Sequence, residues 1–251
     1  MPARDPFTED QIAAMLKTNA FGIGDRLRNQ TMFLSQLSFG VRISELLRLR
    51  RGDVIDGTGE LRQRVTFTRT KNGSPHTVDF VNELGRDYML RWLRHIQDHG
   101  FVLATDPVFP GHIAGKSLTR QQFNHILHRA AVEIKFPGWS GSHSCRKTWA
   151  VNTYKFYTRK NRMGEDIDPL QQLKEAGGWK TLEAAGKYIR SMLVDWRESQ
   201  AALYPNLQAM LLGPDCNTVR GEKTSFQNSH MIDRAYFKVM DFNPTATNNH
   251  E

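Results

Sequence analysis

An imidazole and a guanidinium stand three residues apart in the stretch that runs from Gly141 to Ala150. His143 and Arg146 belong to a segment with a helical pattern after a small, turn-prone Gly-Ser start. Residues at this spacing share one face of a helix, about 5–6 Å apart at Cβ. Arginine offers phosphate a fixed two-pronged donor, and histidine can donate to a neighbouring oxygen or take its proton. The pair suits a phosphate group, although the same spacing also occurs on solvated helix faces without a function.

The charge of the chain favours a polyanionic partner. Its 251 residues include Lys+Arg 34 and Asp+Glu 26, which gives a formal net charge of +8, and a hydrophobic fraction of 39% is enough for a sizeable core. A basic surplus of this kind favours nucleic acid and carries no information on fold. Half of it lies between residues 42 and 71, where eight basic residues outnumber four acidic ones. The basic residues of this segment, named the basic band below, are Arg42, Arg48, Arg50, Arg51, Arg62, Arg64, Arg69 and Lys71.

Several classes of protein are disfavoured. No apolar run approaches the roughly 18 residues of a membrane span, and the polar start of the chain is no signal peptide. The two cysteines are Cys145 and Cys216. Because Cys145 falls inside a predicted helix, we expect no structural disulfide and a reducing cytoplasm. No Cys/His cluster has metal-ligand spacing, so we expect no metal and no cofactor.

The elements that must position the His143–Arg146 pair are mostly helices. Apolar periodicity predicts helices over about 9–20, 26–38, 42–50, 83–99, 118–132, 143–157, 168–176 and from 181. Between them, residues 62–69 and 76–80 alternate in the manner of strands, and Asn72-Gly73 is a strong hairpin signal that places Lys71 at the tip. Residues 159–164 are predicted as an exposed basic loop. The fold class is α+β, mainly helical, with a small antiparallel β-sheet.

Four segments, in order, resemble the motifs of the tyrosine recombinase (phage integrase) family. They are Phe39–Leu46, similar to its first arginine box; Thr68–Lys71, similar to its catalytic-lysine hairpin; His143–Ala150, similar to its second box; and Ala176–Arg190, similar to its last segment. The nine-residue step from Trp179 to Tyr188 equals the family's step to its nucleophile. Trp179 stands where most relatives have histidine, as in the Cre-like tryptophan variant. The resemblance covers roughly residues 8–195.

This resemblance implies a metal- and ATP-independent DNA strand transferase. Arg42 and Arg146 would clamp a phosphodiester, Tyr188 would attack it, and His143 would assist proton removal. Lys71 would protonate the leaving 5′-oxygen, Trp179 would donate its indole N–H, and Glu45 would support Arg42. For each of these residues a structural role remains the alternative: a surface salt bridge for the arginines, a solvated turn for Lys71, core packing for His143 and Trp179, and a core-rim position for Tyr188.

The resemblance also implies an organisation and partners. We expect an N-terminal arm over 1–7, a catalytic domain over 8–212 and a polar tail over 213–251 that docks on a neighbouring protomer. Amphipathic residues 194–212 and the apolar island 235–240 are the candidate docking segments. Relatives usually carry a core-binding domain in front, for which this chain leaves no room. The expected partners are double-stranded DNA and three further copies, forming a homotetramer on two duplexes, without a membrane, in the cytoplasm of a bacterium or phage host.

The expected outcome is site-specific recombination through a 3′-phosphotyrosyl intermediate. Integration, excision, inversion and plasmid resolution are equally compatible with the sequence. Two alternatives stay open: type IB topoisomerase-like or hairpin-resolvase activity, and a non-catalytic DNA-binding accessory role.

Overall fold

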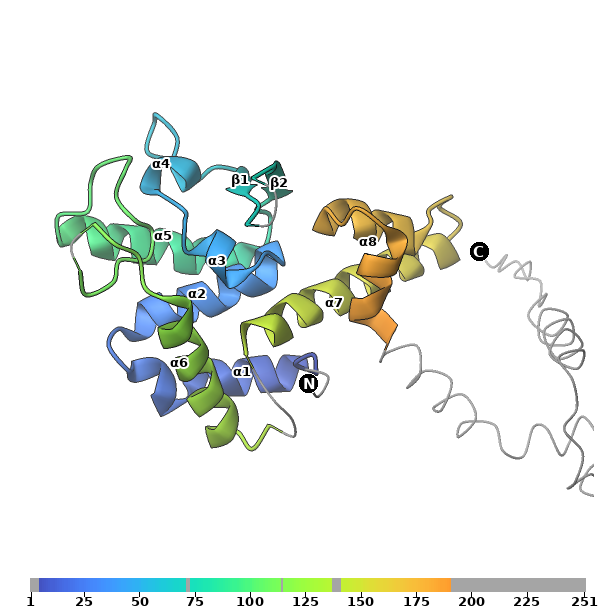
Figure 1. Ribbon diagram of the computed structural model, residues 1–251, viewed down its shortest axis with the longest axis horizontal. Helices are drawn as coiled ribbons and strands as arrows, with labels where there is room; N and C mark the ends of the chain where they lie inside the picture. The colour runs from blue at the N-terminus through green and yellow to red at the C-terminus, as the bar shows by residue number, and fades with distance from the viewer. Residues whose placement is uncertain (1–4, 71–72, 114, 137–140, 191–251) are drawn as a thin grey trace, which may run out of the picture. The chain divides into compact units, whose positions relative to one another are not determined.

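The computed structural model describes residues 5–70, 73–113, 115–136 and 141–190, all within one compact unit, Met1–Asp195. Helices dominate and a two-stranded sheet is inserted among them (Figure 1). The elements are α1 (Glu9–Lys17), the 3-10 helix η1 (Asn19–Gly22), α2 (Arg26–Phe39), α3 (Ile43–Leu46), α4 (Arg51–Val54), β1 (Arg64–Thr68), β2 (Pro75–Asp79), α5 (Glu83–Asp98), α6 (Arg120–Glu133), α7 (Ser142–Arg162) and α8 (Pro169–Gly177). Residues 182–190 are also helical.

Side-chain caps begin several of these helices. Thr8 and Gln11 form a reciprocal capping box at α1, and Thr119 opens α6 in the same way. Asp168 accepts hydrogen bonds from the first turn of α8, whose first residue is Pro169. These contacts satisfy N–H groups that have no partner inside the helix. The predicted helix starts at Thr8 and Asp168 are confirmed.

Helix α2 forms the centre of the main core. It packs against α5, α7 and η1, and its Met32 and Phe33 are fully buried. The Phe33 ring meets Phe7 and Phe21 at centroid distances of 5.8 and 5.5 Å. Full burial of each such side chain stabilises the fold by roughly 1.5–3 kcal/mol. Because α2 leads directly into the segment of Arg42, this core fixes the place of the first predicted site residue.

The hairpin packs one face on the same core. Strands β1 and β2 pair antiparallel, with Val65 opposite Val78 and Phe67 opposite His76. Val65 and Phe67 are buried, and the rings of Phe67 and Phe80 contact Phe39 at the end of α2. The alternation of buried and exposed residues along β1 is the period-2 pattern of a half-buried strand. The predicted antiparallel sheet is confirmed, while Lys71 and Asn72 lie outside the described residues.

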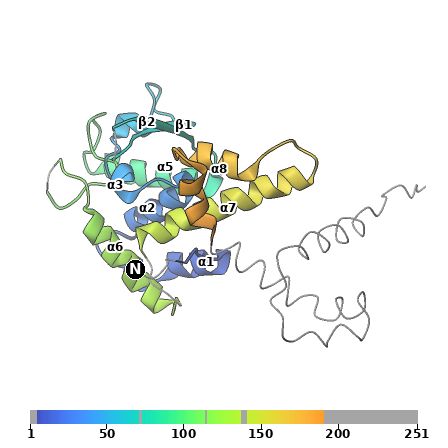
Figure 2. The same ribbon diagram turned by 45° about the vertical axis from the view of Figure 1, so that its right-hand side comes forward.

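A second, smaller core joins α7 to α8 and to residues 182–190. Its buried members are Ala150, Val151, Leu173, Ala185 and Ile189. Helix α7 runs beside α2, and α8 packs on α7, in both views (Figure 1, Figure 2). This arrangement brings the end of α8 towards the hairpin and the start of α7.

Gly40 allows α2 and α7 to approach closely. It ends α2 with φ +61, a conformation that glycine adopts without steric cost. A Cβ at this position would lie 2.1 Å from the Trp149 ring of α7. The glycine in the predicted break before Arg42 therefore has a packing role as well as a conformational one.

Two predicted boundaries are wrong. The helix expected over 42–50 ends at Leu46 as α3, and a separate short helix, α4, begins only at Arg51, because Arg50 forms a β-bridge with Pro107 and Leu49 accepts a hydrogen bond from the Val108 backbone. Tertiary pairing here overrides the helical pattern. The loop expected over 159–164 is instead helical as far as Arg162, where basic side chains suit the negative end of the helix dipole.

The structure also describes the segment before α1 and the surroundings of Cys145. The segment before α1 is anchored on α7, since the Phe7 N–H donates to the Thr148 hydroxyl at 2.7 Å. Cys145 is buried with a free thiol. Within the described ranges no helix has the length and apolarity to cross a membrane, and no group of three potential ligands could hold a metal. The predicted segments 194–212 and 235–240 lie outside these ranges.

Candidate active site

Arg42 is held by a buried carboxylate one turn further along α3. Its Nη1 lies 3.0 Å from Glu45 Oε1, and its backbone N–H donates to Glu45 Oε2 at 2.9 Å. The Glu45 side chain is only 2% exposed, whereas 33% of the Arg42 side chain is accessible. The carboxylate therefore fixes a partly exposed guanidinium from below. The predicted supporting position of Glu45 beside Arg42 is observed.

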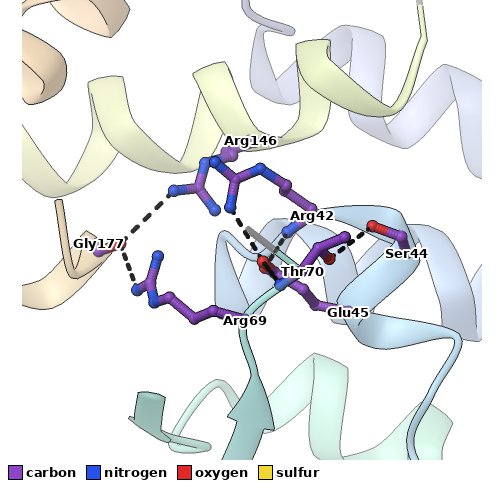
Figure 3. A network of polar contacts seen from close by, with 7 residues as sticks. All are labelled: Arg42, Ser44, Glu45, Arg69, Thr70, Arg146 and Gly177. Atoms are coloured by element: carbon purple, nitrogen blue, oxygen red, sulfur yellow. Dashed lines mark hydrogen bonds and ion pairs between the residues drawn. The ribbon is translucent and has the colours of Figure 1, made fainter. Parts of the chain in front are cut away.

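The hairpin also contacts Glu45. The Thr70 N–H donates to Glu45 Oε1 at 3.2 Å, and the Ser44 and Thr70 hydroxyls are hydrogen-bonded at 3.1 Å (Figure 3). Burial raises the pKa of Glu45, but hydrogen bonds from the Arg42 and Thr70 backbones and the Arg42 side chain outweigh it and hold this pKa below its ordinary value. Glu45 therefore stays ionised at neutral pH and connects Arg42 to the residue before Lys71.

Arg146 is held in a different way. It is 2% exposed, and among the residues that the structure describes no carboxylate forms an ion pair with it. Its Nη2 donates to the Gly177 carbonyl at 3.5 Å, while its Nε is buried without a hydrogen-bond partner in the described ranges. Burial lowers the pKa of Arg146, an effect that the nearby Tyr188 hydroxyl opposes. Arginine remains charged even so, and the site thus contains a buried cation without a paired anion.

Two aromatic rings flank the Arg146 guanidinium. Its Cζ lies 4.7 Å from the centre of the Trp179 ring and 5.6 Å from that of Tyr188. The Trp179 and Tyr188 rings are themselves 5.0 Å apart. Cation–π attraction stabilises such contacts. The interaction of Tyr188 with this guanidinium raises the pKa of Arg146 and opposes the effect of burial. The structure thus brings together three of the predicted residues around one charge.

His143 and the two arginines line one pocket at the start of α7. The pocket has a volume of about 320 Å³, and its other walls come from α2, α3 and α6. Its lining residues are Gln36, Arg42, Ile43, Ser44, Arg120, Asn124, Ser142, His143 and Arg146. His143 and Arg146 both line this pocket, as expected for two residues on one face of a helix. His143 is exposed, whereas Arg146 is buried. The pocket offers an anion three guanidiniums, those of Arg42, Arg120 and Arg146, and an imidazole.

Two hairpin residues near this cluster escape sequence-based prediction. Arg69 donates from Nη2 to the Gly177 carbonyl at 2.9 Å (Figure 3). His76 lies beside the same turn, where a Cβ on Gly178 would be 2.9 Å from its Nδ1. Burial, followed by the charges of Arg69 and Arg146, lowers the pKa of His76 to about 4. The sequence analysis places Arg69 in the basic band and in the Thr68–Lys71 segment, without a role of its own. The alternation of the strands did place both residues on the hairpin, but only the fold shows which segment they meet.

Five of the six predicted catalytic residues thus converge. Arg42, His143 and Arg146 share the pocket, and the rings of Trp179 and Tyr188 lie against the Arg146 guanidinium. Lys71, the sixth residue, lies outside the described residues, two positions beyond Arg69 in the chain. The spatial convergence supplies what the linear motifs alone lack, a common centre of positive charge.

Comparison with known proteins gives a consistent result. In fold, the chain is similar to XerH site-specific recombinase bound to palindromic difH substrate (TM-score 0.58, 16% identity, 80% of this chain and 53% of that one). It is also similar to XerA recombinase (TM-score 0.55, 16% identity, 78% and 66%) and to the Tn1549 transposon integrase in complex with transposon right end DNA (TM-score 0.52, 14% identity, 82% and 67%). The chain spans about half to two thirds of the length of these proteins.

At these identities the structural likeness concerns the fold. No curated protein matches the chain in sequence. The family profile described as "Phage integrase family", however, matches residues 6–193, which include every candidate residue named above. The chain belongs to the phage integrase family of tyrosine recombinases.

Proposed function

We propose that this protein is a site-specific DNA recombinase that cleaves and rejoins DNA through a 3′-phosphotyrosyl intermediate. The observation that carries the proposal is the position of the Tyr188 ring, 5.6 Å from the guanidinium carbon of the buried Arg146, with Arg42 lining the adjoining pocket. A phenol with a pKa near 10 needs adjacent positive charge and a proton acceptor to attack at neutral pH. Arg146 supplies the positive charge beside Tyr188, and we propose His143 as the proton acceptor.

In the proposed cleavage, the Tyr188 oxygen attacks phosphorus and the bond from phosphorus to the 5′-oxygen breaks. The phenolic proton passes to His143, and Lys71 gives a proton to the departing 5′-oxygen. The phosphate remains a diester, now joined to tyrosine, so the bond energy is conserved. A free 5′-hydroxyl reverses the attack and rejoins the strand.

Arg42 and Arg146 stabilise the charge that develops on the non-bridging oxygens. Guanidinium forks bind phosphate oxygens in two-pronged fashion, and preorganised donors in a water-poor site contribute most to such stabilisation. The partnerless Nε of Arg146 and the ordered guanidinium of Arg42 meet this requirement. Trp179 donates its indole N–H, and its ring keeps Arg146 in place.

The basic band supplies contacts to the DNA backbone around this site. Several of its members, such as Arg48, Arg50 and Arg64, are exposed. Backbone contacts of this kind dominate affinity and make it depend on salt. We propose double-stranded DNA as the partner, bound by a homotetramer on two duplexes, with a catalytic domain over 8–212 and the tail over 213–251 docking on a neighbouring protomer.

The proposal is tested with a pool of nicked duplexes of random sequence. After incubation and denaturation, wild-type protein should give a covalent protein–DNA band on a gel, and Tyr188→Phe should give none. Absence of the band in wild type, with DNA still bound, would identify an accessory DNA-binding protein instead. The DNA recovered from the band reveals the target sequence.

A supercoiled plasmid with two copies of the recovered sequence then separates recombination from relaxation. Recombinant products from wild type support the proposed function. Relaxation without exchange would assign the chain to topoisomerase-like activity and contradict it.

A further inference from the structure

The turn that follows α8 is bound from two sides through one carbonyl oxygen. The Gly177 carbonyl accepts from Arg69 Nη2 at 2.9 Å and from Arg146 Nη2 at 3.5 Å (Figure 3). Arg69 stands directly after β1, and Arg146 lies on α7. Three segments far apart in the sequence therefore meet at one backbone atom. Trp179 is the last residue of this turn, directly after Gly177 and Gly178.

Both glycines of the turn are shaped by these neighbours. Gly178 has φ +57, and a Cβ on it would lie 1.9 Å from Arg69 Nη2 and 2.9 Å from His76 Nδ1. A Cβ on Gly177 would lie 1.8 Å from the Trp179 ring. The turn thus fits the Arg69 side chain as closely as the backbone permits. Any other residue at Gly178 has to displace Arg69 as well as adopt an unfavourable backbone conformation.

His76 makes a second connection between the hairpin and α8. Its half-buried ring lies against Gly178, where an added Cβ would be 2.9 Å from Nδ1, and the charges of Arg69 and Arg146 act on it. Strand register places His76 opposite Phe67, whose buried ring fixes this part of the hairpin to the core. The hairpin therefore holds the end of α8 through two adjacent side chains.

The charged Arg69 guanidinium donates its hydrogen bond to a neutral acceptor, a backbone carbonyl. It is half-buried, and burial lowers its pKa, followed by opposing effects of Glu45 and Arg42. Its observed partner is a carbonyl that it shares with Arg146, not a carboxylate. An arginine that only bound DNA phosphate would have no need of a glycine turn built around it. This geometry indicates a role in fixing the turn.

We propose that Arg69 is a positioning residue that holds the Gly177–Trp179 turn against Arg146 and thereby fixes Trp179 and Tyr188 relative to the hairpin of Lys71. The inference rests on the proposed function, because positioning has meaning only if Tyr188 attacks DNA. Arg69 acts through the Gly177 carbonyl. The hairpin and the nucleophile segment would then move as one unit.

The contact itself is tested without DNA by a double-mutant cycle in thermal unfolding. Arg69→Ala and Gly178→Ala should each lower the melting temperature by roughly 2–4 °C, the shift expected for a loss near 1 kcal/mol in a domain of this size. In the double variant the second change should cost clearly less than it does alone, because the clash with the guanidinium is gone. Strictly additive shifts would overturn the contact.

The positioning role is tested with the duplex recovered from the wild-type covalent band. Arg69→Ala should reduce the single-turnover cleavage rate at saturating DNA by about tenfold or more while the dissociation constant changes less than about twofold. Arg91→Ala is the matched control, since Arg91 is an exposed arginine of α5 that pairs with Asp87 away from the site. It should leave both quantities unchanged.

The opposite result would assign Arg69 to the DNA backbone. In that case the dissociation constant would rise, the slope of its logarithm against salt would fall by about one contact, and the saturated cleavage rate would stay at the wild-type value. Failure of the proposed function is distinguishable, because wild type would then give no covalent band while the unfolding cycle still reports the contact.

Discussion

The two central arginines are held in opposite ways. Arg42, on the side of α3, is one-third exposed and pairs with the buried carboxylate of Glu45. Arg146, on α7, is buried between the Trp179 and Tyr188 rings and shares only a carbonyl with Arg69. A carboxylate orients a guanidinium but cancels much of its field. An aromatic cage orients it and leaves its charge for an incoming anion.

This difference suggests a division of labour. Arg42 is positioned in advance and remains accessible at the pocket mouth, so it suits the capture of a phosphate. Arg146 lies deeper, with an unsatisfied Nε and the Tyr188 hydroxyl at hand, so it suits stabilisation of charge during attack. Burial of a charge without a paired anion costs stability, and such a cost is typical of a functional site.

The largest effect is expected from removing the caged arginine. Arg146→Ala should lower the single-turnover cleavage rate by roughly 10³-fold, because one preorganised donor is worth about 10²–10³ and the cage also loses its centre. Arg146→Lys should recover little of the lost cleavage rate, since a lysine ammonium lacks the planar, forked donors with which a guanidinium can contact the Gly177 carbonyl and a phosphate at once. Retention of near wild-type cleavage by either variant, with its melting temperature intact, would contradict the assignment.

Both arginines depend on the approach of α2 to α7 at Gly40. Gly40→Ala should lower the free energy of unfolding by about 2–4 kcal/mol, because strain at positive φ adds to overpacking against the Trp149 ring. Urea unfolding measures the loss. Trp149→Leu in the same chain should recover part of it by making room. If Gly40→Ala unfolds like wild type, the close contact between the two helices is wrong.

The carboxylate-held arginine should be less sensitive. Arg42→Ala should reduce cleavage by about 10²-fold. Glu45→Gln should reduce it by about tenfold, because the amide can still accept one hydrogen bond while the charge that orients Arg42 is lost. The double variant should be little worse than Arg42→Ala alone, since Glu45 acts through Arg42. Multiplicative losses would show that Glu45 has an independent role.

The smallest expected effect is the pH dependence of folding stability that His76, on strand β2, contributes. The pKa of His76 is about 4 in the folded chain and 6.5 in the reference state, so the unfolded chain binds more protons between these values. The stability that comes with a neutral His76 ring is therefore fully present above pH 6.5, and it is lost as pH falls towards 4. The half-exposed ring limits the change to about 1 kcal/mol. His76→Gln should remove this slope from unfolding measured across the window, and an unchanged slope would contradict the buried neutral state.

The sequence predicts more of the site than of its supports. Arg42, His143, Arg146, Trp179 and Tyr188 were found because each stands in a short motif at fixed spacing, and helical periodicity with side-chain caps located most elements. The early end of the helix predicted over 42–50, at Leu46, could not be predicted, since it depends on the pairing of residues 49 and 50 with Pro107 and Val108. Likewise, the contact of Arg69 with Gly177 joins residues more than one hundred positions apart. Long-range backbone acceptors leave no local signal.

The most direct test of the account is to map the amino acid that becomes attached to DNA. Wild-type protein is trapped on the nicked duplex pool and digested with nuclease and trypsin, and the nucleotide-bearing peptide is sequenced by mass spectrometry. Because Lys187 and Arg190 flank it, the account predicts the modification on the peptide Tyr188–Arg190. Attachment at any other tyrosine, or at none, would contradict the claim that Tyr188 attacks beside Arg146.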